Sequence, residues 1–198
     1  MQSGQLPDAA TVETACQLVD YRQLKLTADT VYLGKTGMSI TLDGIGKGYI
    51  IDRGAAVFGS YGLDQVIVEL GSDLQTRGQA QGHPWRVAIQ RPPNDTSNSP
   101  LVAELSQAAM ATSGDYHYTF TADRRLHHIL DPTSGLSPGD LTSASVLAPT
   151  TCAADALSTA VMVMGAEHGL NLIAQLPDTE ALVIRKNGMV QYSSRFPL

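Results

Sequence analysis

The sequence contains little charge and little cysteine, and each shortage excludes a class of protein. Charged residues make up 16% of the 198-residue chain, and the formal net charge is −6. Because no basic stripe is present to neutralise a phosphate backbone, we do not expect nucleic-acid binding. The two cysteines, Cys16 and Cys152, have no metal-ligand spacing, and the sequence leaves open whether they pair or stay reduced.

Long apolar runs and export signals are absent as well. No apolar stretch approaches the roughly 20 residues that span a bilayer, so no transmembrane segment is predicted. The N-terminus up to Tyr21 has neither a basic n-region nor a continuous apolar h-region, so no signal peptide is predicted. Hydrophobic residues nevertheless make up 43% of the chain. This length and composition suffice for one sizeable core or two small lobes.

Hydrophobic periodicity and turn residues predict more strands than helices. Helices are expected after the cap Asp8, from the Gly44–Gly48 turn to Gly62, and over Thr151–Gly165 and Ala166–Leu176. Strands are expected at Leu24–Leu26, Val31–Leu33, Met38–Leu42, Gln65–Leu70, Trp85–Gln90, Leu101–Leu105, Ala108–Thr112, His127–Pro132, Ser143–Leu147, Ala181–Arg185 and Met189–Tyr192. The stretch Arg91–Pro100 is typical of a surface loop. Strands in antiparallel-looking groups favour the α+β class over a doubly wound parallel sheet.

Three alternating glycines stand in the stretch Asp43–Asp52, where a helical pattern begins. Glycine lets the backbone approach a ligand closely, and the unpaired N–H groups at a helix start favour an anion. Lys47 adds a full positive charge, so a phosphate group is the expected ligand. The alternative is a tight strand-to-helix turn whose lysine is only solvated. The spacing matches neither a Walker A loop nor the G-x-G-x-x-G fingerprint.

A carboxylate and a hydroxyl share one face of a predicted apolar helix. Asp155 and Thr159 stand four residues apart on the Thr151–Gly165 helix, and this spacing places them on the same side. Mg²⁺ takes one or two protein carboxylates, accepts neutral oxygens and completes its shell with water and substrate phosphate. The pair therefore indicates a hard-cation site. The alternative is that Thr159 bonds to its own helix and Asp155 stabilises the positive N-terminal end.

Two adjacent histidines, His127 and His128, lie in a predicted strand, so at most one can point into a given site. An imidazole can take a proton from a hydroxyl nucleophile near neutral pH. The alternative is a surface histidine beside a core histidine. The dipeptide Ser113-Gly114 lacks the flanks of G-x-S-x-G, so a serine hydrolase is not predicted.

Five motifs combine these signals in one order along the chain. They are the glycine turn, Val68-Glu-Leu-Gly-Ser-Asp73, Ala111-Thr-Ser-Gly-Asp-Tyr116, His127-His-Ile-Leu-Asp-Pro132-Thr-Ser-Gly135 and Ala153-Ala-Asp-Ala-Leu-Ser-Thr159-Ala. Their order resembles the ApbE family, the FAD:protein FMN transferases, over most of the chain. The resemblance implies a single α+β domain over residues 1–198, with a largely antiparallel sheet, packed helices and the T-fold-related architecture of that family.

The resemblance also implies an activity. ApbE-like enzymes cleave FAD, transfer FMN to a threonine or serine hydroxyl of an acceptor protein, and release AMP. Mg²⁺ is the implied cofactor and FAD the implied substrate. The implied acceptor is a flavoprotein subunit of a membrane electron-transport complex, and the implied location is periplasmic or membrane-associated, although no export signal is present here.

Site residues follow from the same resemblance, position by position. Asp155 and Thr159 match the Mg²⁺ ligands, together with the backbone carbonyl of Gly44. Lys47 would lie near the flavin pyrophosphate, and His128 would be the base that activates the acceptor hydroxyl. The residues expected to border the flavin nucleotide are Gly46, Gly71, Thr112, Ser113 and Gly114.

Three features depart from the family pattern. Thr41-Leu-Asp43-Gly44 stands where the family usually has Asp-Leu-Gly-Gly, so a carboxylate is lost at 41 and one is gained at 43. His117 stands where Glu is common. The chain also matches only about the C-terminal two-thirds of a usual family member. The alternatives to a transferase are therefore an Mg²⁺-dependent FAD pyrophosphatase, in which water replaces the acceptor hydroxyl, and a flavin-binding protein or fragment without turnover.

Overall fold

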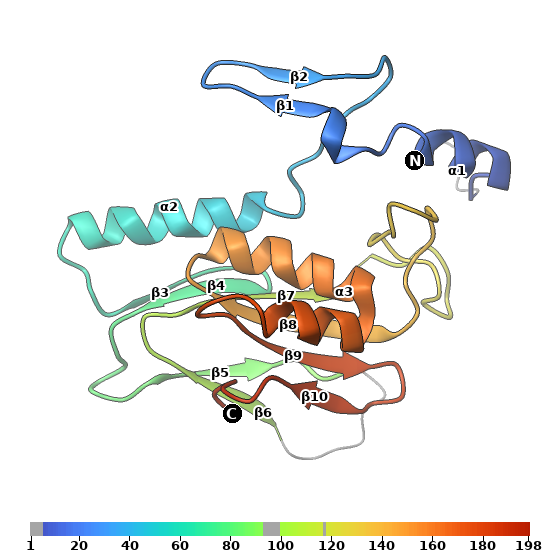
Figure 1. The fold of residues 1–198 in the computed structure, drawn as a ribbon. Coiled ribbons are helices and arrows are strands. Elements are labelled where there is room, and N and C mark those ends of the chain that lie inside the picture. The colour runs from blue at the N-terminus through green and yellow to red at the C-terminus, as the bar shows by residue number, and fades with distance from the viewer. Residues whose placement is uncertain (1–5, 93–99, 117) are drawn as a thin grey trace.

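The computed structural model describes residues 6–92, 100–116 and 118–198 and has helices packed on an antiparallel sheet (Figure 1). The helices are α1 (Ala9–Cys16), the 3-10 turn Tyr21–Gln23, α2 (Gly46–Ser60) and α3 (Thr151–Ile173). The strands are β1 (Leu24–Leu26), β2 (Val31–Leu33), β3 (Val66–Leu70), β4 (Asp73–Arg77), β5 (Trp85–Ile89), β6 (Leu101–Leu105), β7 (Ala109–Gly114), β8 (Leu141–Ala148), β9 (Glu180–Arg185) and β10 (Val190–Tyr192). Six strands form one sheet in the order β10-β9-β8-β7-β4-β3, with every pair antiparallel. The predicted α+β class is confirmed.

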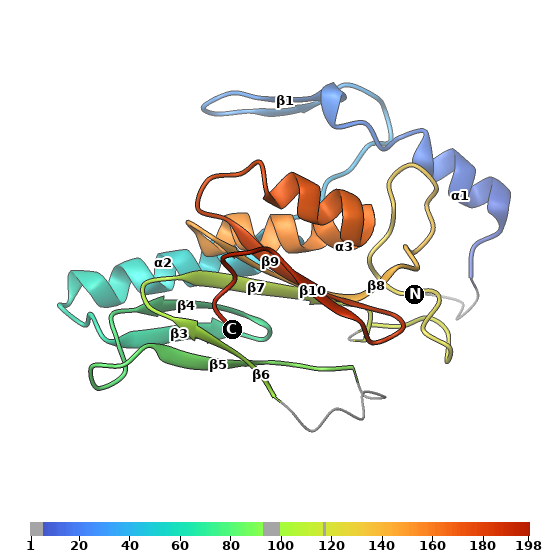
Figure 2. The ribbon, with the colours of Figure 1, turned by 60° about the horizontal axis from the view of Figure 1, so that its bottom comes forward.

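The six-stranded sheet separates two hydrophobic layers. Helices α2 and α3 cover one face, and the β5–β6 hairpin lies on the other (Figures 1 and 2). The layer beneath α3 includes Val146, Val161, Met162, Ile173 and Val183. The layer beneath the hairpin includes Ile89, Leu105, Leu147, Leu182 and Ile184. Strand β8 is buried along its whole length because it lies between both layers. Full burial contributes about 1.5–3 kcal/mol for each large apolar side chain.

The pleat of β7 sends two neighbouring hydroxyls to opposite faces of the sheet. Ser113 faces α3, where its Oγ lies 2.8 Å from Ser158 Oγ. Thr112 faces the β5–β6 layer, and its Oγ1 lies 2.8 Å from Ser145 Oγ on β8. Successive strand residues point to opposite sides, so this division is a direct consequence of the strand. The residues predicted to border the flavin nucleotide are therefore divided between the two faces.

Two predicted strands are wrong, and one strand was not predicted. Met38–Leu42 and His127–Pro132 are irregular, apart from a single bridge between Thr119 and His127. The backbone of His127 instead bonds to Ser137, whose Oγ accepts the His127 N–H at 2.8 Å and donates to its carbonyl at 2.7 Å. Such side-chain bonds compete with a strand ladder. Strand β4 was missed because its polar sequence becomes a strand only by pairing with β3 and β7.

The predicted helix end at Gly165 is confirmed. Gly165 has φ of 77° inside α3, so two helical segments meet there at a kink. Positive φ is readily adopted only by glycine. Asp140 stabilises the second segment, because its Oδ2 accepts the Ala166 N–H at 2.8 Å.

The N-terminal part stands apart from the sheet. Asp8 caps α1 as predicted, with its Oδ1 accepting the Thr11 N–H at 2.8 Å. Figures 1 and 2 both show the β1–β2 hairpin projecting away from the sheet. Helix α1 contacts the loop before β8, where a Cβ built on Gly135 would lie only 2.4 Å from Val12 Cγ1. Large exposed apolar side chains gather on the hairpin, on α2 and at its C-terminal cap, namely Leu26, Val31, Tyr32, Tyr49, Ile50, Val57, Phe58 and Tyr61.

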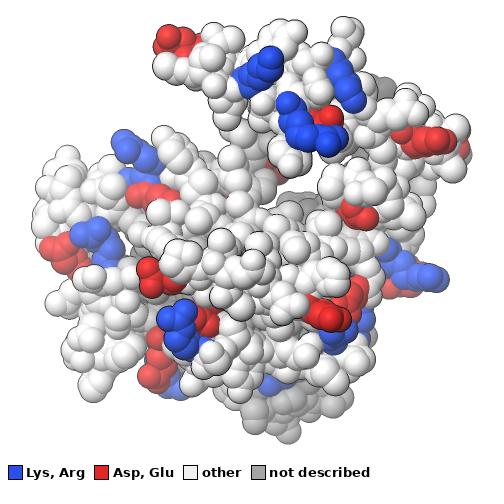
Figure 3. Space-filling view, viewed as in Figure 1, with Lys and Arg blue, Asp and Glu red and all other residues white. Residues whose placement is uncertain are grey.

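The surface carries scattered charge. On the face shown in Figure 3, Lys and Arg side chains lie among Asp and Glu side chains rather than in a stripe. Among helices in the described part of the chain, none has the length and apolarity that crossing a bilayer requires.

Candidate active site

The N-terminal parts of α2 and α3 are joined by hydrogen bonds, of which one is buried and two are partly buried. The Gly48 N–H donates to Asp155 Oδ2 at 3.0 Å. One turn later in α2, the Asp52 carboxylate accepts the N–H groups of Thr151 and Cys152 at 2.8 and 2.9 Å. A Cβ built on Gly48 would lie 2.4 Å from the Thr151 carbonyl oxygen, so only glycine allows this approach. No role was predicted for Asp52, although its position four residues after Gly48 places both on one helical face.

Two glycine amides of the turn donate to groups within the chain. Gly46 N–H donates to the Leu42 carbonyl at 2.7 Å, and Gly48 N–H donates to Asp155 as described above. The negative group beside the α2 N-terminus is therefore the protein's own carboxylate. Lys47 is the positively charged group of the turn, and its side chain is 41% exposed.

Four oxygen-bearing side chains, Ser113, Asp155, Ser158 and Thr159, form what we call the oxygen cluster. Ser113 Oγ lies 2.8 Å from Ser158 Oγ and 3.1 Å from Thr159 Oγ1. The Ser158 hydroxyl donates to the Asp155 carbonyl at 2.9 Å. Gly44 lies alongside, since a Cβ built on it would be 3.9 Å from Thr159 Oγ1. The cluster thus unites β7, the start of α3 and the turn before α2.

Asp155 is the buried carboxylate of the cluster, with 3% of its surface exposed. Burial raises its pKa above 3.8, the Gly48 N–H lowers it, the charge of Asp73 raises it and Lys47 lowers it. In the described residues, no three or more His, Cys, Asp or Glu side chains are grouped to hold a metal. The donors beside Asp155 are instead a hydroxyl and backbone oxygen. Because Mg²⁺ accepts one carboxylate, neutral oxygens and water, these residues fit it, and a cation would stabilise the ionised Asp155.

Lys47 is held by a residue that the sequence analysis did not single out. Its Nζ lies 2.7 Å from Asp73 Oδ2, and Asp73 is 1% exposed while the lysine side chain is 41% exposed. The other oxygen, Asp73 Oδ1, accepts the Thr112 N–H at 3.3 Å, and the Ser72 hydroxyl donates to the Thr112 carbonyl at 2.8 Å. The first residue of β4 therefore orients Lys47 beside the oxygen cluster. The pairing of Asp73 with Lys47 depends on the position of Asp73 at the start of β4, and this strand was not predicted from the sequence.

The two histidines lie on an irregular segment, residues 118–140, which we call the histidine loop. His127 is fully buried, and its Nε2 lies 3.2 Å from the Pro138 carbonyl, to which the ring donates when Nε2 carries the proton. Burial lowers the pKa of His127 below 6.5. His128 is exposed, its Nδ1 lies 3.3 Å from the Tyr118 carbonyl, and its ring packs edge-on against Tyr118. Within the described residues, His128 contacts Tyr118 and His127 of this loop and not the oxygen cluster.

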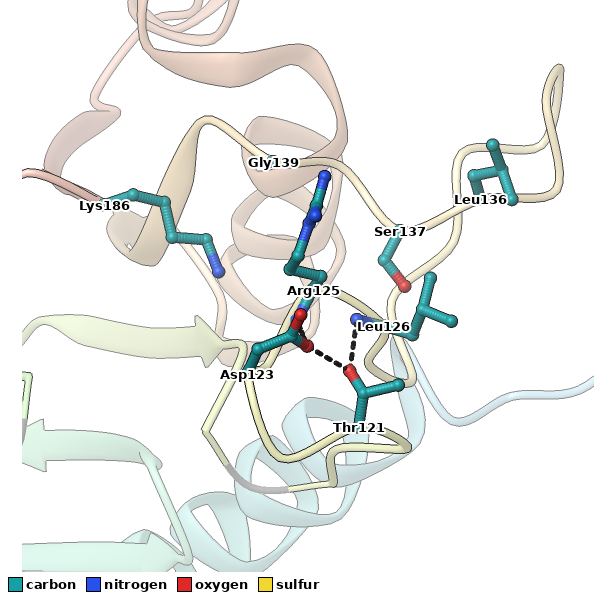
Figure 4. Close-up of a pocket in the computed structure, with 8 residues that line it drawn as sticks. All are labelled: Thr121, Asp123, Arg125, Leu126, Leu136, Ser137, Gly139 and Lys186. Carbon is teal, nitrogen blue, oxygen red and sulfur yellow. Dashed lines mark hydrogen bonds between the residues drawn. The ribbon is translucent and has the colours of Figure 1, made fainter. Parts of the chain in front are cut away.

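A hollow of about 640 Å³ opens against the histidine loop (Figure 4). Its lining includes the side chains of Arg125, Leu126 and Lys186. Lys186 pairs with Asp115, a residue that is 2% exposed and directly follows Gly114. A second hollow of about 340 Å³, on the β5 side of the sheet, is lined by residues that include Gly71 and Thr112. Gly71 has φ of 66° in the β3–β4 turn.

The structure describes the first of the three departures from the family pattern, the altered stretch before the glycine turn. Thr41 and Asp43 are exposed, and the Asp43 N–H donates to Thr41 Oγ1 at 3.2 Å. The second departure, His117, lies outside the described residues, as does 93–99 of the predicted surface loop.

Fold and geometry together define an α+β protein whose oxygen-rich site, with one lysine beside it, suits a divalent cation and a phosphate group. The chain belongs to the ApbE family, whose family model matches residues 1–183. The resemblance stated from the motifs is thereby confirmed.

Two relatives named FAD:protein FMN transferase are similar to this chain. The chain is 33% identical over 208 residues to the FAD:protein FMN transferase of Treponema pallidum, a match that covers 96% of this chain and 57% of the relative. It is 36% identical over 160 residues to the enzyme of the same name from Vibrio cholerae, covering 78% of this chain and 48% of the relative. The chain thus spans about half the length of these relatives.

Solved structures agree with the fold. The ApbE protein of Thermotoga maritima has a TM-score of 0.85 at 30% identity, over 96% of this chain and 63% of that one. The flavin transferase ApbE of Vibrio cholerae has a TM-score of 0.84 at 26% identity, over 98% of this chain and 62% of that one. The ApbE-like architecture is therefore confirmed.

Proposed function

We propose that this chain carries the catalytic site of an Mg²⁺-dependent FAD:protein FMN transferase. The observation that carries the proposal is the junction of the glycine turn with α3, where Gly48 binds the buried Asp155 and Gly44 lies beside Thr159. Relatives that match 96% and 78% of the chain bear that enzyme name. The oxygen cluster supplies the donor types that Mg²⁺ prefers, and Lys47 supplies a positive charge for a pyrophosphate.

In this proposal, Asp155, Thr159 and the Gly44 carbonyl hold the metal. Bound Mg²⁺ would spread the negative charge that develops on the pyrophosphate. Lys47 binds the same phosphates, and Gly71, Thr112 and Gly114 line the nucleotide site. His128 takes the proton from the acceptor hydroxyl, whose oxygen forms a bond to the phosphorus of the FMN half of FAD. The bond between the two phosphates breaks, and AMP leaves with the bridging oxygen.

His128 is suited to meet a protein acceptor because its side chain is exposed on the histidine loop. We further propose that the acceptor is a flavoprotein subunit of an electron-transport complex and that the protein works in the periplasm or at a membrane. Fractionation of cells that express the protein from its own gene tests the location, because recovery only in the cytoplasm would contradict it.

The test is a paired incubation of the purified chain with FAD and a peptide that carries a threonine acceptor site. One reaction contains Mg²⁺ and the other contains EDTA. Covalent flavin fluorescence on the peptide and released AMP are measured together, and Asp155→Ala serves as the control enzyme. We expect labelling and AMP in equal amounts, only with Mg²⁺.

Each other outcome favours a different function. AMP and FMN without labelled peptide would identify a pyrophosphatase, in which water reaches the exposed His128 in place of the acceptor. FAD that binds but stays intact would identify a flavin-binding protein without turnover. Equal labelling in EDTA would contradict the metal ligands proposed here.

A further inference from the structure

The oxygen cluster contains three hydroxyls and three hydrogen bonds, which determines where each proton points. A hydroxyl has one proton to donate and two lone pairs that accept. The Ser158 proton is committed, because its partner, the Asp155 carbonyl, can only accept. In the 2.8 Å bond between Ser158 and Ser113, Ser113 must therefore be the donor.

The same count determines the third bond. Since the Ser113 proton goes to Ser158, Ser113 Oγ can only accept in its 3.1 Å bond with Thr159 Oγ1. Thr159 is therefore the donor, and this is its one side-chain hydrogen bond among the described residues. The proton of Thr159 points toward β7. Its lone pairs are left for the space on the Gly44 side, where a Cβ would lie 3.9 Å away.

We infer that Ser113 is a positioning residue that turns the Thr159 hydroxyl so that it can act as a metal ligand. The inference rests on the proposed metal site and concerns only how this chain prepares one ligand of it. A hydroxyl binds a cation through a lone pair, so a proton pointing toward the metal would repel it. The series of hydrogen bonds from Thr159 to Ser113, from Ser113 to Ser158 and from Ser158 to the Asp155 carbonyl keeps the Thr159 proton from pointing toward the metal.

This role differs from the flavin contact that the family resemblance implies for Ser113. A flavin contact would depend on Ser113 alone. The positioning role also depends on Ser158, which is 1% exposed and lies behind Ser113. Without Ser158, the Ser113 proton has lost its acceptor and can turn toward Thr159.

The opposite face of β7 offers a matched control. Thr112 Oγ1 and Ser145 Oγ form a buried hydroxyl pair of the same 2.8 Å length one residue away, and Ser145 lies on β8. Ser145→Ala removes one member of this pair without touching the oxygen cluster. It controls for the loss of a buried hydroxyl at this end of the sheet.

The experiment measures Mn²⁺ binding to the FAD-free protein by electron paramagnetic resonance, with Mg²⁺ as competitor. We expect Ser113→Ala and Ser158→Ala each to weaken metal binding about tenfold or more, as other residues that orient metal ligands do. Thr159→Ala should weaken it at least as much, and Ser145→Ala should leave it unchanged. FAD binding in EDTA is the second readout and should be the same in Ser158→Ala as in the wild type. Thermal unfolding confirms that each variant is folded.

The outcomes separate this inference from the metal site itself. If Thr159→Ala loses the metal while Ser113→Ala and Ser158→Ala keep wild-type affinity, the positioning role is overturned and the site stands. If Ser113→Ala alone weakens FAD binding in EDTA and leaves the metal bound, Ser113 is a flavin contact instead. If the wild-type protein binds no metal, both the site and the inference are overturned.

Discussion

The two parts of the candidate active site are held in place in different ways. The oxygen cluster lies where β7, α2 and α3 meet, and its groups, which are buried or half-buried, are joined by hydrogen bonds between elements. The histidine loop has almost no regular structure, and His127 bonds to Ser137 and Pro138 of the same segment. The comparison indicates that the groups proposed to hold a metal are preorganised by the core, whereas the proposed base is presented at the surface, where an acceptor protein can reach it.

The largest expected effect is on the oxygen cluster. Asp155→Ala removes the one buried carboxylate of the proposed metal site, so we expect FMN transfer to fall on the order of 10⁴-fold and FAD affinity to fall as well. Initial rates and FAD titrations with Mg²⁺ measure both. The control is Glu167→Ala, which removes an exposed carboxylate from the same helix. Transfer within a few-fold of wild type would show that the cluster does not hold the metal.

On the histidine loop, we expect a substitution of His128 to lower only the rate of FMN transfer. His128→Ala removes the proposed base, and we expect transfer to fall on the order of 10³-fold while FAD affinity stays at the wild-type value. Replacing the exposed His168 on α3 with Ala controls for the loss of a surface imidazole. FMN transfer at the wild-type rate would show that His128 is not the base. A loss of FAD affinity in His128→Ala would show that His128, like Asp155, also contributes to FAD binding.

Asp73 and Lys47 should act as one unit. Lys47→Met and Asp73→Asn should each slow transfer about 10- to 100-fold, because a charge-assisted hydrogen bond typically contributes about 1.5–3 kcal/mol. The double variant should be no slower than Lys47→Met alone, since Asp73 works through Lys47. The kcat and KM for FAD of all four proteins measure this. Effects that simply multiply would show that Asp73 has an independent role.

The smallest expected effect concerns pH. Burial lowers the pKa of His127 below 6.5, so an opened loop binds a proton more tightly than the native loop. The stability that neutral His127 contributes is present above about pH 6.5 and is lost as the pH falls through the lowered pKa. Amide exchange should therefore show more frequent opening of the histidine loop at pH 5.5 than at pH 7.5, after correction for intrinsic rates. Strands β8 and β9 should show no such change, and His127→Gln should abolish it. Equal opening at both values would mean that His127 does not stabilise the loop.

Much of the architecture follows from local sequence. The apolar spacing of α2 and α3, the cap Asp8 and the break at Gly165 were predicted, and each is a signal carried within a few residues. The strand after Gln107 was predicted to end at Thr112, but β7 continues to Gly114. Because the predicted strand ended at Thr112, Ser113 was not expected to alternate with it. Both were predicted to border the flavin nucleotide, although they face opposite sides of the sheet.

The histidine segment shows the limit of local patterns. Its apolar and aromatic residues favour a strand, but Ser137 bonds to both backbone groups of His127 and takes the place of a neighbouring strand. The expectation that only one histidine can point into a given site agrees with the structure, since one is buried and the other exposed. The two histidines point in different directions because His127 is buried within the histidine loop, and not because they alternate along a strand.

The sequence by itself determined the α+β class, the glycine turn that starts α2, and the carboxylate and hydroxyl four residues apart on α3, because helical spacing and glycine geometry are local properties. Only the tertiary structure decided that Asp73 holds Lys47, that Asp52 joins α2 to α3, and that Ser113 points to Thr159. Each of these pairs lies far apart in the chain or depends on β4 and β7 lying side by side in the sheet. Their contacts exist only once the antiparallel sheet and its two covering helices have assembled.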